Sequence, residues 1–388
     1  MKNTLLLKYL IISLISIVYM SILCPISISA NESFKNIGIQ NGLAHTDANC
    51  VAQDSTGLIW IGTNSGLQNF DGYQLQTIDY YPSNQKIYES HNHITALECS
   101  KNRLWVGSDS GLTCLDLNTH LYVPYTIAEG DPTIFNQRIL RLSIDNANHH
   151  LWIRVENQLY VAKIEEATNT LYLLEWDNNS NLSTYWTQQK PVIYEGKAWI
   201  TTDKALIQLA IINQKVHIKR RYQLEDLLRQ KTEISSLYAS EGYLYLRSSQ
   251  GCFRLPFSDN DLNTSDLSYI DFHQTNPNIP NNTIATFCVG KDGTLWCGYF
   301  GGIFEVRQPF TEHRTINQYL ENNRNINFSR TRISSLFIDK FNNLWISTID
   351  RGLYYRSLTS APFQYLPNEK FQEIGFAKNE ISSVTAQD

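Results

Sequence analysis

Short stretches in which apolar and polar residues alternate recur along most of the chain, and clusters of Gly, Asn, Asp and Ser separate them. Alternation with a period of two is typical of strands with one buried face. The clearest stretch predicts strands over residues 48–53, 58–63, 66–70 and 73–78. The next stretch predicts strands over residues 93–99, 102–108, 111–117 and 121–127. Only residues 224–231 carry a helical pattern, so the chain is predicted to be almost entirely β.

One short phrase recurs in seven copies. It first occurs as DSTGLIWIGTNSGL at residues 54–67 and returns as SKNRLWVGSDSGL at residues 100–112. Three copies with weaker similarity follow, and the last two copies, KDGTLWCGYFGGI and KFNNLWISTIDRGL, agree more closely with the first. The aromatic residues that mark the seven copies are Trp60, Trp105, Trp152, Trp199, Tyr245, Trp296 and Trp345. The numbers of successive markers differ by 45 to 51.

A strand-rich repeat of this length is typical of β-propeller blades, which contain four strands each. Helical repeats of similar length do not fit the strand pattern. We therefore predict an all-β fold, a seven-bladed β-propeller of four-stranded blades over residues 31–379, with residues 380–388 as the start of a truncated eighth repeat. Each marker aromatic is expected to wedge between neighbouring blades, and Gly62 and Gly107 to allow close backbone approach.

Structural roles are expected for residues that recur with the blades. Six of the eight Trp residues hold the same place in the repeat, as packing side chains do. Trp176 and Trp186 lie outside this register and are open to another role. Acidic residues that recur in the turns, and are expected to form turns rather than to act as catalytic acids, are Asp54, Asp145, Asp292 and Asp339.

The composition is that of a folded domain. Of 388 residues, 42% are hydrophobic, 12% are aromatic and 18% are charged, and the formal net charge is −5. The apolar content excludes global disorder. Nucleic acid is not expected as a partner, because phosphate binding needs a concentrated basic surface.

The first 30 residues have the layout of a secretory signal peptide. Lys2 and Lys8 precede an apolar run, and small residues follow at Ser27, Ser29 and Ala30. We expect cleavage after Ser29 or Ala30 and export of the rest of the chain. The alternative is an uncleaved anchor, because the run has about the 20 apolar residues that a spanning helix needs. Membrane contact is expected only through this segment if it stays uncleaved.

Six cysteines lie beyond the targeting segment. They form neither C-x-x-C pairs nor a Cys/His cluster with zinc-ligand spacing. Buried, separate thiols are predicted, and disulfides are the alternative in an oxidising compartment. The six are Cys50, Cys99, Cys114, Cys252, Cys288 and Cys297.

The wording of the repeat resembles a known family. GLIWIGTNSGLQNFDGY and NRLWVGSDSGL resemble the two-component regulator propeller repeat, and IGIQNGLAHTDANCVAQDSTGLIWIGT resembles the first blade of that family. The family is found in the periplasmic sensor regions of hybrid two-component systems of Bacteroides-type bacteria. The resemblance extends over residues 34–388 and is strong in copies one, two, six and seven. Copies three to five depart from it, because Arg154-Val155 replaces Gly-Thr and Tyr245 replaces Trp.

The resemblance implies signalling as part of a larger receptor. Family members usually continue into a second propeller, a β-sandwich, a membrane helix, a histidine kinase, a receiver and a DNA-binding module. These modules are not in this sequence, and residues 371–388 echo residues 34–54. We therefore expect an N-terminal sensor fragment whose partners are the remainder of a hybrid sensor kinase or a second protomer.

Two ways of closing the ring fit the sequence. Either residues 34–39 supply the outer strand of the seventh blade, or residues 362–366 supply it and the N-terminal strand lies on the rim. We favour the second. A closed ring is expected because an open one leaves sheet edges unprotected.

Candidates for catalysis or metal binding are few. Glu89, His91 and His93 lie together in YESHNHI, and His149 and His150 are adjacent in a predicted turn. Both groups are interpreted as solvated loops, because no third ligand is evident. No nucleophile-elbow, metalloprotease or phosphate-cradling motif is present in the sequence. We expect no catalytic, cofactor-binding or metal-binding residues, no cofactor and no enzymatic activity.

Ligand binding is the expected activity, because a propeller gathers loops around a central channel. The inter-blade segments are rich in Tyr, Asn, Gln and Pro, which suit an oligosaccharide through stacking faces and amide hydrogen bonds. The sequence does not identify the ligand-binding residues. Our hypothesis is a non-catalytic extracytoplasmic sensor that regulates polysaccharide utilisation, and the alternatives are a secreted propeller lyase or glycosidase, or a protein-interaction scaffold. The segments are 80–93, 129–137, 178–188 and 276–282.

Overall fold

The computed structural model describes residues 34–79, 92–129, 136–156, 158–177, 190–248, 250–258, 261–279, 284–319, 321–322, 326–328 and 331–359. One compact unit extends from Phe34 to Leu358. The expected targeting segment at 1–30 and the expected eighth repeat at 380–388 lie outside the described residues. Of the helices in the described part, none is both long and apolar enough to span a membrane.

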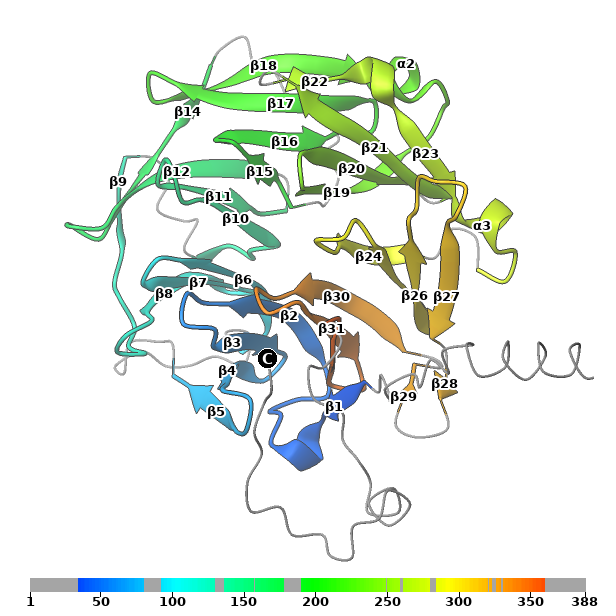
Figure 1. Ribbon diagram of the computed structural model, residues 1–388. Coiled ribbons are helices and arrows are strands. Elements are labelled where there is room, and N and C mark those ends of the chain that lie inside the picture. Colours follow the sequence, from blue (N-terminus) through cyan, green and yellow to red (C-terminus); the bar gives the residue numbers. More distant parts are fainter. Residues whose placement is uncertain are drawn as a thin grey trace, which may run out of the picture. The chain divides into compact units, whose positions relative to one another are not determined.

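Seven small sheets follow one another along the chain and stand around a common centre (Figure 1). Within each sheet, the first strand of the repeat is nearest the centre, and each following strand pairs mostly antiparallel with the one before it. The prediction of a seven-bladed β-propeller is therefore confirmed.

The strands of the blades are these. The first blade contains β2 (Ala48–Gln53), β3 (Ile59–Thr63), β4 (Gly66–Phe70) and β5 (Leu75–Ile78). The second contains β6 (Ile94–Ser100), β7 (Arg103–Ser108) and β8 (Gly111–Asp116). The third contains β10 (Arg141–Asp145), β11 (His150–Arg154), β12 (Leu159–Glu165), β13 (Thr170–Leu173) and β9 (Thr126–Glu129). The next two contain β15 (Val192–Tyr194), β16 (Lys197–Thr201), β17 (Ala205–Ile212), β18 (Lys215–Gln223) and β14 (Glu175–Trp176); and β19 (Ile234–Ser240), β20 (Tyr243–Ser248), β21 (Gly251–Ser258), β23 (Ser268–Asp271) and β22 (Asp261–Leu262). The last two contain β24 (Ile284–Val289), β25 (Leu295–Tyr299), β26 (Gly302–Arg307) and β27 (Thr315–Tyr319); and β30 (Arg332–Ile338), β31 (Asn343–Ile349), β32 (Leu353–Ser357) and β1 (Lys35–Ile37).

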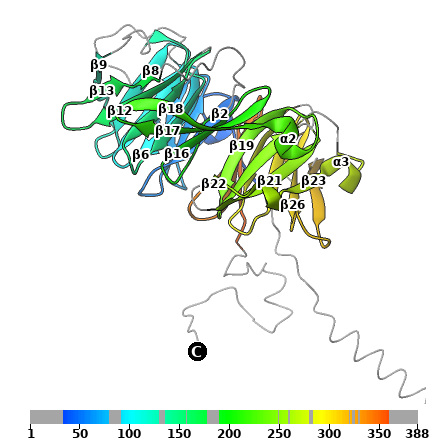
Figure 2. The same cartoon turned by 90° about the horizontal axis from the view of Figure 1, so that it is seen from above.

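Helices are short in the described part of the chain. The predicted helix at 224–231 is the shorter α2 (Leu224–Leu228), which ends where Arg229 takes a left-handed conformation with φ of 56°. Figure 2 shows α2 and α3 (Phe272–Thr275) beside the strands of the fifth blade. The remaining small elements are η1 (Ile39–Asn41), η4 (Thr264–Asp266), β28 (Glu321–Asn322) and β29 (Ile326–Asn327).

The marker aromatics form the core between blades, as the sequence predicts. Each lies on the second strand of its blade, and none is more than 4% exposed. Seven hydrophobic clusters join each blade to the next. Trp60 packs with Leu104 and Val106 of the second blade. Trp345 packs with Ile59 and Ile61 of the first blade, so the last cluster closes the ring.

Three blades place a glycine two residues after the marker aromatic, and each allows a close approach by the next blade. A β-carbon added there would lie 2.5 to 2.6 Å from the Cγ2 atom of an isoleucine at the start of the next repeat. This distance is too short for two carbon atoms, so the predicted close approach at Gly62 and Gly107 is confirmed. The three contacts are Gly62 with Ile94, Gly107 with Ile139, and Gly298 with Ile333.

The outer strand of the seventh blade comes from the N-terminal end of the propeller. β1 pairs antiparallel with β32, and Lys35 lies opposite Tyr355. Phe34, the residue before β1, is 1% exposed and lies in the core. Its ring contacts that of Tyr319 edge to face, with the ring centroids 5.4 Å apart. The closure that we favoured, with residues 362–366 in this position, is therefore wrong. The side chain of Phe34 supplies the reason, because its burial holds the strand in the blade.

The second blade departs from four strands. Tyr122 makes a single bridge to Leu115, and Pro124 then follows. Proline lacks the N–H that a ladder needs, so the pairing stops there. The chain continues as β9, which pairs in parallel with β13 of the third blade. The predicted strand at 121–127 is thus divided between two blades.

The third and fourth blades are linked in the same way. β14 pairs in parallel with β18, which makes the fourth blade five-stranded. Trp176 lies on β14, and its indole nitrogen donates to the Leu159 carbonyl oxygen of the third blade at 3.3 Å. The off-register Trp176 therefore has a packing role of its own. Trp186 lies outside the described residues.

Candidate functional site

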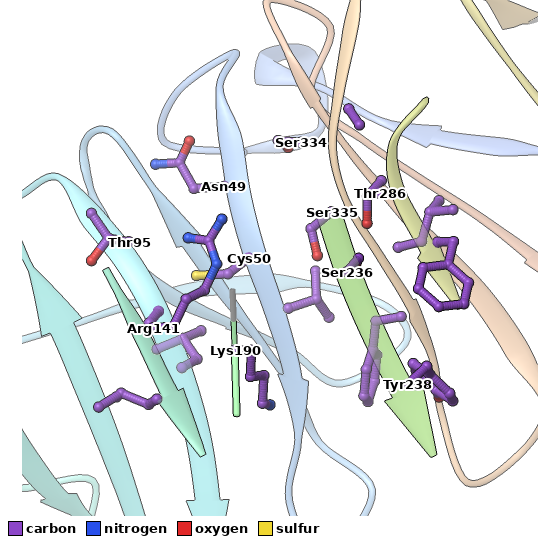
Figure 3. Close-up of a pocket in the computed structure, with 18 of the residues that line it drawn as sticks. Asn49, Cys50, Thr95, Arg141, Lys190, Ser236, Tyr238, Thr286, Ser334 and Ser335 are labelled. Carbon is purple, nitrogen blue, oxygen red and sulfur yellow. The ribbon is translucent and has the colours of Figure 1, made fainter. Parts of the chain in front are cut away.

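The innermost strands surround a cavity of about 400 Å³ at the centre of the propeller (Figure 3). A volume of this size is in the range of small-molecule sites. The cavity is lined by β2, β6, β10, β19, β24 and β30, and by Lys190, which precedes β15 in the fourth blade.

Each blade contributes one residue to a layer around this cavity, and the strand register defines its position. In six blades this residue lies on the innermost strand and pairs with the residue two positions after the marker aromatic, as Cys50 pairs with Gly62 and Arg141 with Arg154. In the fourth blade Lys190 lies two residues before Val192, the partner of the marker Trp199, which gives it the same place. We call these residues the channel layer: Cys50, Ala96, Arg141, Lys190, Ser236, Thr286 and Ser335.

A β-bulge before the channel layer aims neighbouring side chains at the next blade. The pairing shifts by one residue just before the layer in five blades. The extra residue is left unpaired, as is usual for a bulge. Asn49 uses this position to donate its amide to the Ile94 carbonyl oxygen at 2.8 Å. Ser334 donates to the Ala48 carbonyl oxygen at 2.6 Å. These polar groups therefore join blades and are already satisfied.

Three hydroxyls of the channel layer differ from the bulge residues. Ser236, Thr286 and Ser335 come from β19, β24 and β30 and lie together on one side of the pocket (Figure 3). Their side chains make no hydrogen bond to another described residue, in contrast to Asn49 and Ser334. They are therefore available to a polar ligand.

The opposite side of the pocket carries positive charge. Lys190 reaches past the third blade to Glu98 of β6, and its Nζ lies 2.8 Å from the carboxylate Oε2. Arg141 donates from Nη1 to the Leu140 carbonyl oxygen at 2.7 Å. Among the described residues no carboxylate lies within ion-pair distance of Arg141. The Lys190 charge is thus balanced within the protein, and the Arg141 charge is not.

Cys50 lies beside Arg141 (Figure 3) and is a neutral thiol. Burial raises its pKa to about 12, although Arg141, a hydrogen bond with Gly62 and the charge of Lys190 act in the opposite direction. A thiol is a strong nucleophile only as the thiolate. Cys50 is therefore not poised for nucleophilic attack at neutral pH.

The recurring turn aspartates form turns, as predicted. Asp54 accepts hydrogen bonds from the backbone N–H groups of Thr56, Gly57 and Leu58 at 2.9 to 3.1 Å. Its second oxygen accepts from the indole of Trp60 at 2.9 Å. Hydrogen bonds within the turn are also made by Asp145, Asp292 and Asp339.

The candidate histidines do not meet in one site. His93 lies 2.7 Å from Asp109, which also pairs with Arg138. His149 occupies a turn with φ of 56°, as expected for a solvated loop. His150 is instead the first residue of β11, where burial lowers its pKa, so the loop interpretation is wrong for this residue. Glu89 and His91 lie outside the described residues.

The described residues contain no group of three or more His, Cys, Asp or Glu side chains that is arranged to hold a metal ion. The six cysteines Cys50, Cys99, Cys114, Cys252, Cys288 and Cys297 are free thiols, buried or half-buried. The prediction of separate thiols is thus confirmed, and the disulfide alternative is wrong for these six.

The inter-blade segments, where the sequence led us to expect ligand binding, do not include the channel layer. The segment 178–188 lies wholly outside the described residues, and the segments 80–93, 129–137 and 276–282 do so in part. The sequence carries little signal for the channel layer, because its residues stand at different distances before the marker aromatics: 11 residues for Arg141, 9 for Lys190 and Ser236, and 10 for Thr286 and Ser335. Alignment of the repeats on the markers therefore does not bring them into one column, and the pairing register of the strands is needed to place them in one layer.

These features define a β-propeller with a polar, positively charged channel. Residues 42–65 match the family of the two component regulator propeller. The first blade therefore carries a repeat of this family, as its wording predicted. No curated protein matches the chain.

Solved structures with the same fold include sensor domains and an enzyme. The extracellular domain of BT4673 from B. thetaiotaomicron, assigned to a hybrid two component system, superimposes with a TM-score of 0.60 at 19% identity, over 85% of this chain and 40% of that one. The corresponding domain of BT3049 from the same organism gives 0.60 at 18%, over 84% and 42%. Virginiamycin B lyase from Staphylococcus aureus gives 0.58 at 11%, over 84% and 99%.

This chain therefore spans about 40% of the length of the two sensor domains. At these identities the likeness concerns the fold. The chain shares the architecture of extracellular sensor propellers, and it shares that architecture with a lyase as well.

Proposed function

We propose that this chain is a non-catalytic ligand-sensing propeller module that works outside the cytoplasm, in the periplasm, as part of a hybrid two-component sensor. Its ligand is an oligosaccharide, and its output regulates polysaccharide utilisation. The kinase comes from the remainder of the sensor or from a partner protomer. The support consists of the repeat match at residues 42–65 and the fold shared with two extracellular sensor domains.

The channel layer is the observation that carries the binding role. Ser236, Thr286 and Ser335 offer unused hydroxyls to a cavity of about 400 Å³. Phe287 and Phe337 also line it and add apolar surface. Hydroxyls beside aromatic rings suit sugars, which present polar edges and apolar ring faces.

The chemistry of the described lining favours binding over catalysis. Its titratable side chains are Cys50, Arg141, Lys190 and Tyr238, without a carboxylate or a histidine. Burial holds the pKa of Tyr238 well above its usual value. Glycoside hydrolysis usually needs a pair of carboxylates, one as acid and one as base or nucleophile. The described channel supplies neither.

A signal requires that the ligand bind one conformational state more tightly than another. In this proposal, ligand in the channel changes the arrangement of this propeller relative to a second propeller or to a second protomer. The change then passes across the membrane to the kinase.

Isothermal titration calorimetry of the purified chain against a panel of neutral and acidic oligosaccharides tests the proposal. We expect saturable heat with at least one class of oligosaccharide, and the same sugar recovered intact after long incubation. Cleavage of the sugar would overturn the sensor assignment in favour of a lyase or glycosidase. The absence of binding across the panel would overturn the sugar ligand, and a protein-interaction scaffold would then be the better assignment.

A further inference from the structure

We propose that the channel layer binds the carboxylate of an acidic sugar through the guanidinium group of Arg141, and the hydroxyls of that sugar through Ser236, Thr286 and Ser335. The sugar part of this inference rests on the proposed function. The anion site at Arg141 stands on the charges of the channel alone.

Arg141 differs from the ionisable groups beside it, because those groups are paired or neutral. Lys190 is paired with Glu98 at 2.8 Å. Arg138, which lies near Arg141, is paired with Asp109 at 2.8 Å. Cys50 is a neutral thiol at neutral pH. Of the two cationic side chains that line the cavity, Lys190 is therefore paired, and Arg141 has no described carboxylate within ion-pair distance.

Arg141 is exposed to the channel, so an anion in the cavity can reach its guanidinium group. The channel walls lower the pKa of Arg141 through desolvation, which means that its charged form is less well solvated there than in open water. An anion that pairs with this group therefore meets weaker competition from water than it would on an open surface.

The shape of the guanidinium group favours a carboxylate. Arginine has five N–H donors in a planar fork that matches the two oxygens of a carboxylate. The hydrogen bond from Nη1 to the Leu140 carbonyl oxygen uses one donor and fixes the end of the side chain. Other donors remain for a ligand. A sulfate group offers similar oxygen pairs, so the shared chemistry is an oxyanion.

The far side of the channel identifies the rest of the ligand. Figure 3 shows Arg141 on one side and Ser236, Thr286 and Ser335 on the other. A ligand that satisfies both sides carries an anionic group at one end and hydroxyls at the other. An acidic sugar, such as a uronate, has this combination, whereas a neutral sugar leaves Arg141 unpaired.

Calorimetry with digalacturonate and its neutral counterpart galactobiose tests the inference, using the full chain and two variants. Arg141→Gln removes the charge from the channel. Arg314→Gln is the matched control, because Arg314 is exposed just before β27 on the outside of the sixth blade. The shift in thermal midpoint with sodium sulfate is measured on the same three proteins.

We expect wild type and Arg314→Gln to bind digalacturonate at least 10-fold more tightly than galactobiose, and Arg141→Gln to lose this preference. We also expect sulfate to raise the thermal midpoint of Arg141→Gln less than that of the other two proteins. Without ligand, Arg141→Gln should be about as stable as wild type, since Arg141 is exposed and makes no ion pair with a described carboxylate.

Equal affinity for the two disaccharides, or a preference that survives in Arg141→Gln, would overturn the acidic-sugar assignment. A sulfate effect of the same size in all three proteins would overturn the anion site itself. Binding of neutral sugars alone would support the proposed function and contradict this inference. An Arg141-dependent sulfate effect without any sugar binding would support the anion site and contradict the sugar ligand.

Discussion

The indole nitrogen of Trp345 donates a hydrogen bond of 2.9 Å to a carboxylate oxygen of Asp339, the residue that forms the turn before its strand. Trp60 and Asp54 repeat this relationship in the first blade, also at 2.9 Å. One aspartate thus shapes the hairpin and fixes the aromatic wedge. The indole nitrogens of Trp105 and Trp152, in contrast, have no hydrogen-bond partner among the described residues. The first and seventh blades, which meet at the closure of the ring, are therefore the ones held in this way.

Substitution Asp54→Asn should lower the free energy of unfolding by about 1–3 kcal/mol, because it places an amide N–H₂ among buried donors. Asp54 is 5% exposed and accepts from backbone N–H groups and from Trp60. Urea denaturation followed by tryptophan fluorescence measures the loss. Asp203→Asn, at an exposed turn of the fourth blade, serves as the control and should change stability little. An equal effect of both substitutions would contradict the role assigned to Asp54.

Stability should also depend on pH through Asp54. Burial raises its pKa, but hydrogen bonds from Thr56, Trp60, Gly57 and Leu58 outweigh burial and leave the pKa below its ordinary value of 3.8. The contribution is therefore fully present above the ordinary value and is lost as the pH falls through the lower, folded-state value. Denaturation at a series of pH values should show the difference between wild type and Asp54→Asn shrinking below about pH 4. A difference that grows in acid would contradict this sign.

Substitution Gly107→Ala should destabilise the propeller by about 1–3 kcal/mol through overpacking. The new β-carbon would lie 2.6 Å from Cγ2 of Ile139 in the next blade. In the Ile139→Ala background the same substitution should cost less, since Cγ2, the nearest atom, is gone and the remaining Cβ lies farther away at 2.9 Å. A double-mutant cycle of unfolding free energies measures this coupling. Additive effects would show that the two residues do not limit the approach of the blades.

Substitution Phe34→Ala should lower the thermal midpoint strongly, because removal of a buried Phe side chain costs about 3–5 kcal/mol. Phe34 is 1% exposed and packs on Phe328 and Tyr319 of the last repeats. Differential scanning calorimetry measures the change. Ile39→Ala is the control, because Ile39 is 57% exposed only five residues away. A large effect at Ile39 and none at Phe34 would contradict the closure described above.

The thiols of the folded protein should resist alkylation at pH 8. Burial raises the pKa values of Cys50 and Cys297 to about 12 and those of Cys99 and Cys252 well above their usual value. Iodoacetamide labelling followed by mass spectrometry of the peptides should show little modification in the native state and full modification in guanidinium chloride. Rapid labelling of native Cys50 would contradict the neutral thiol in the channel.

Much of the fold could be predicted from the sequence, because the repeated residues form turns and strands through contacts with their near neighbours in the chain. The turn at Asp54 and the strands that flank it are set by neighbours within ten residues, and β2 and β4 have the predicted bounds. The wedge position of Trp60 follows from its constant place in the repeat. Such features depend on short-range geometry that every copy repeats.

The remaining features depend on contacts between distant residues. The pairing of Lys35 with Tyr355 depends on the burial of Phe34 in the last blade. No pattern in the residues near Lys35 predicts this pairing. The channel layer is also non-local, since Arg141 and Ser335 face one cavity only because the blades surround it. Its residues stand at different distances before the marker aromatics and their chemistry differs from copy to copy, so they form no repeated motif.

The pairing of β1 with β32 also constrains how the protein reaches its native state. β1 is synthesised before the other strands of the ring, yet its partner β32 is among the last to be made. Until β32 is available, β1 has no strand to pair with, and the edges of the growing assembly are open to wrong pairing. Closure of the ring is therefore expected to be one of the last steps of folding.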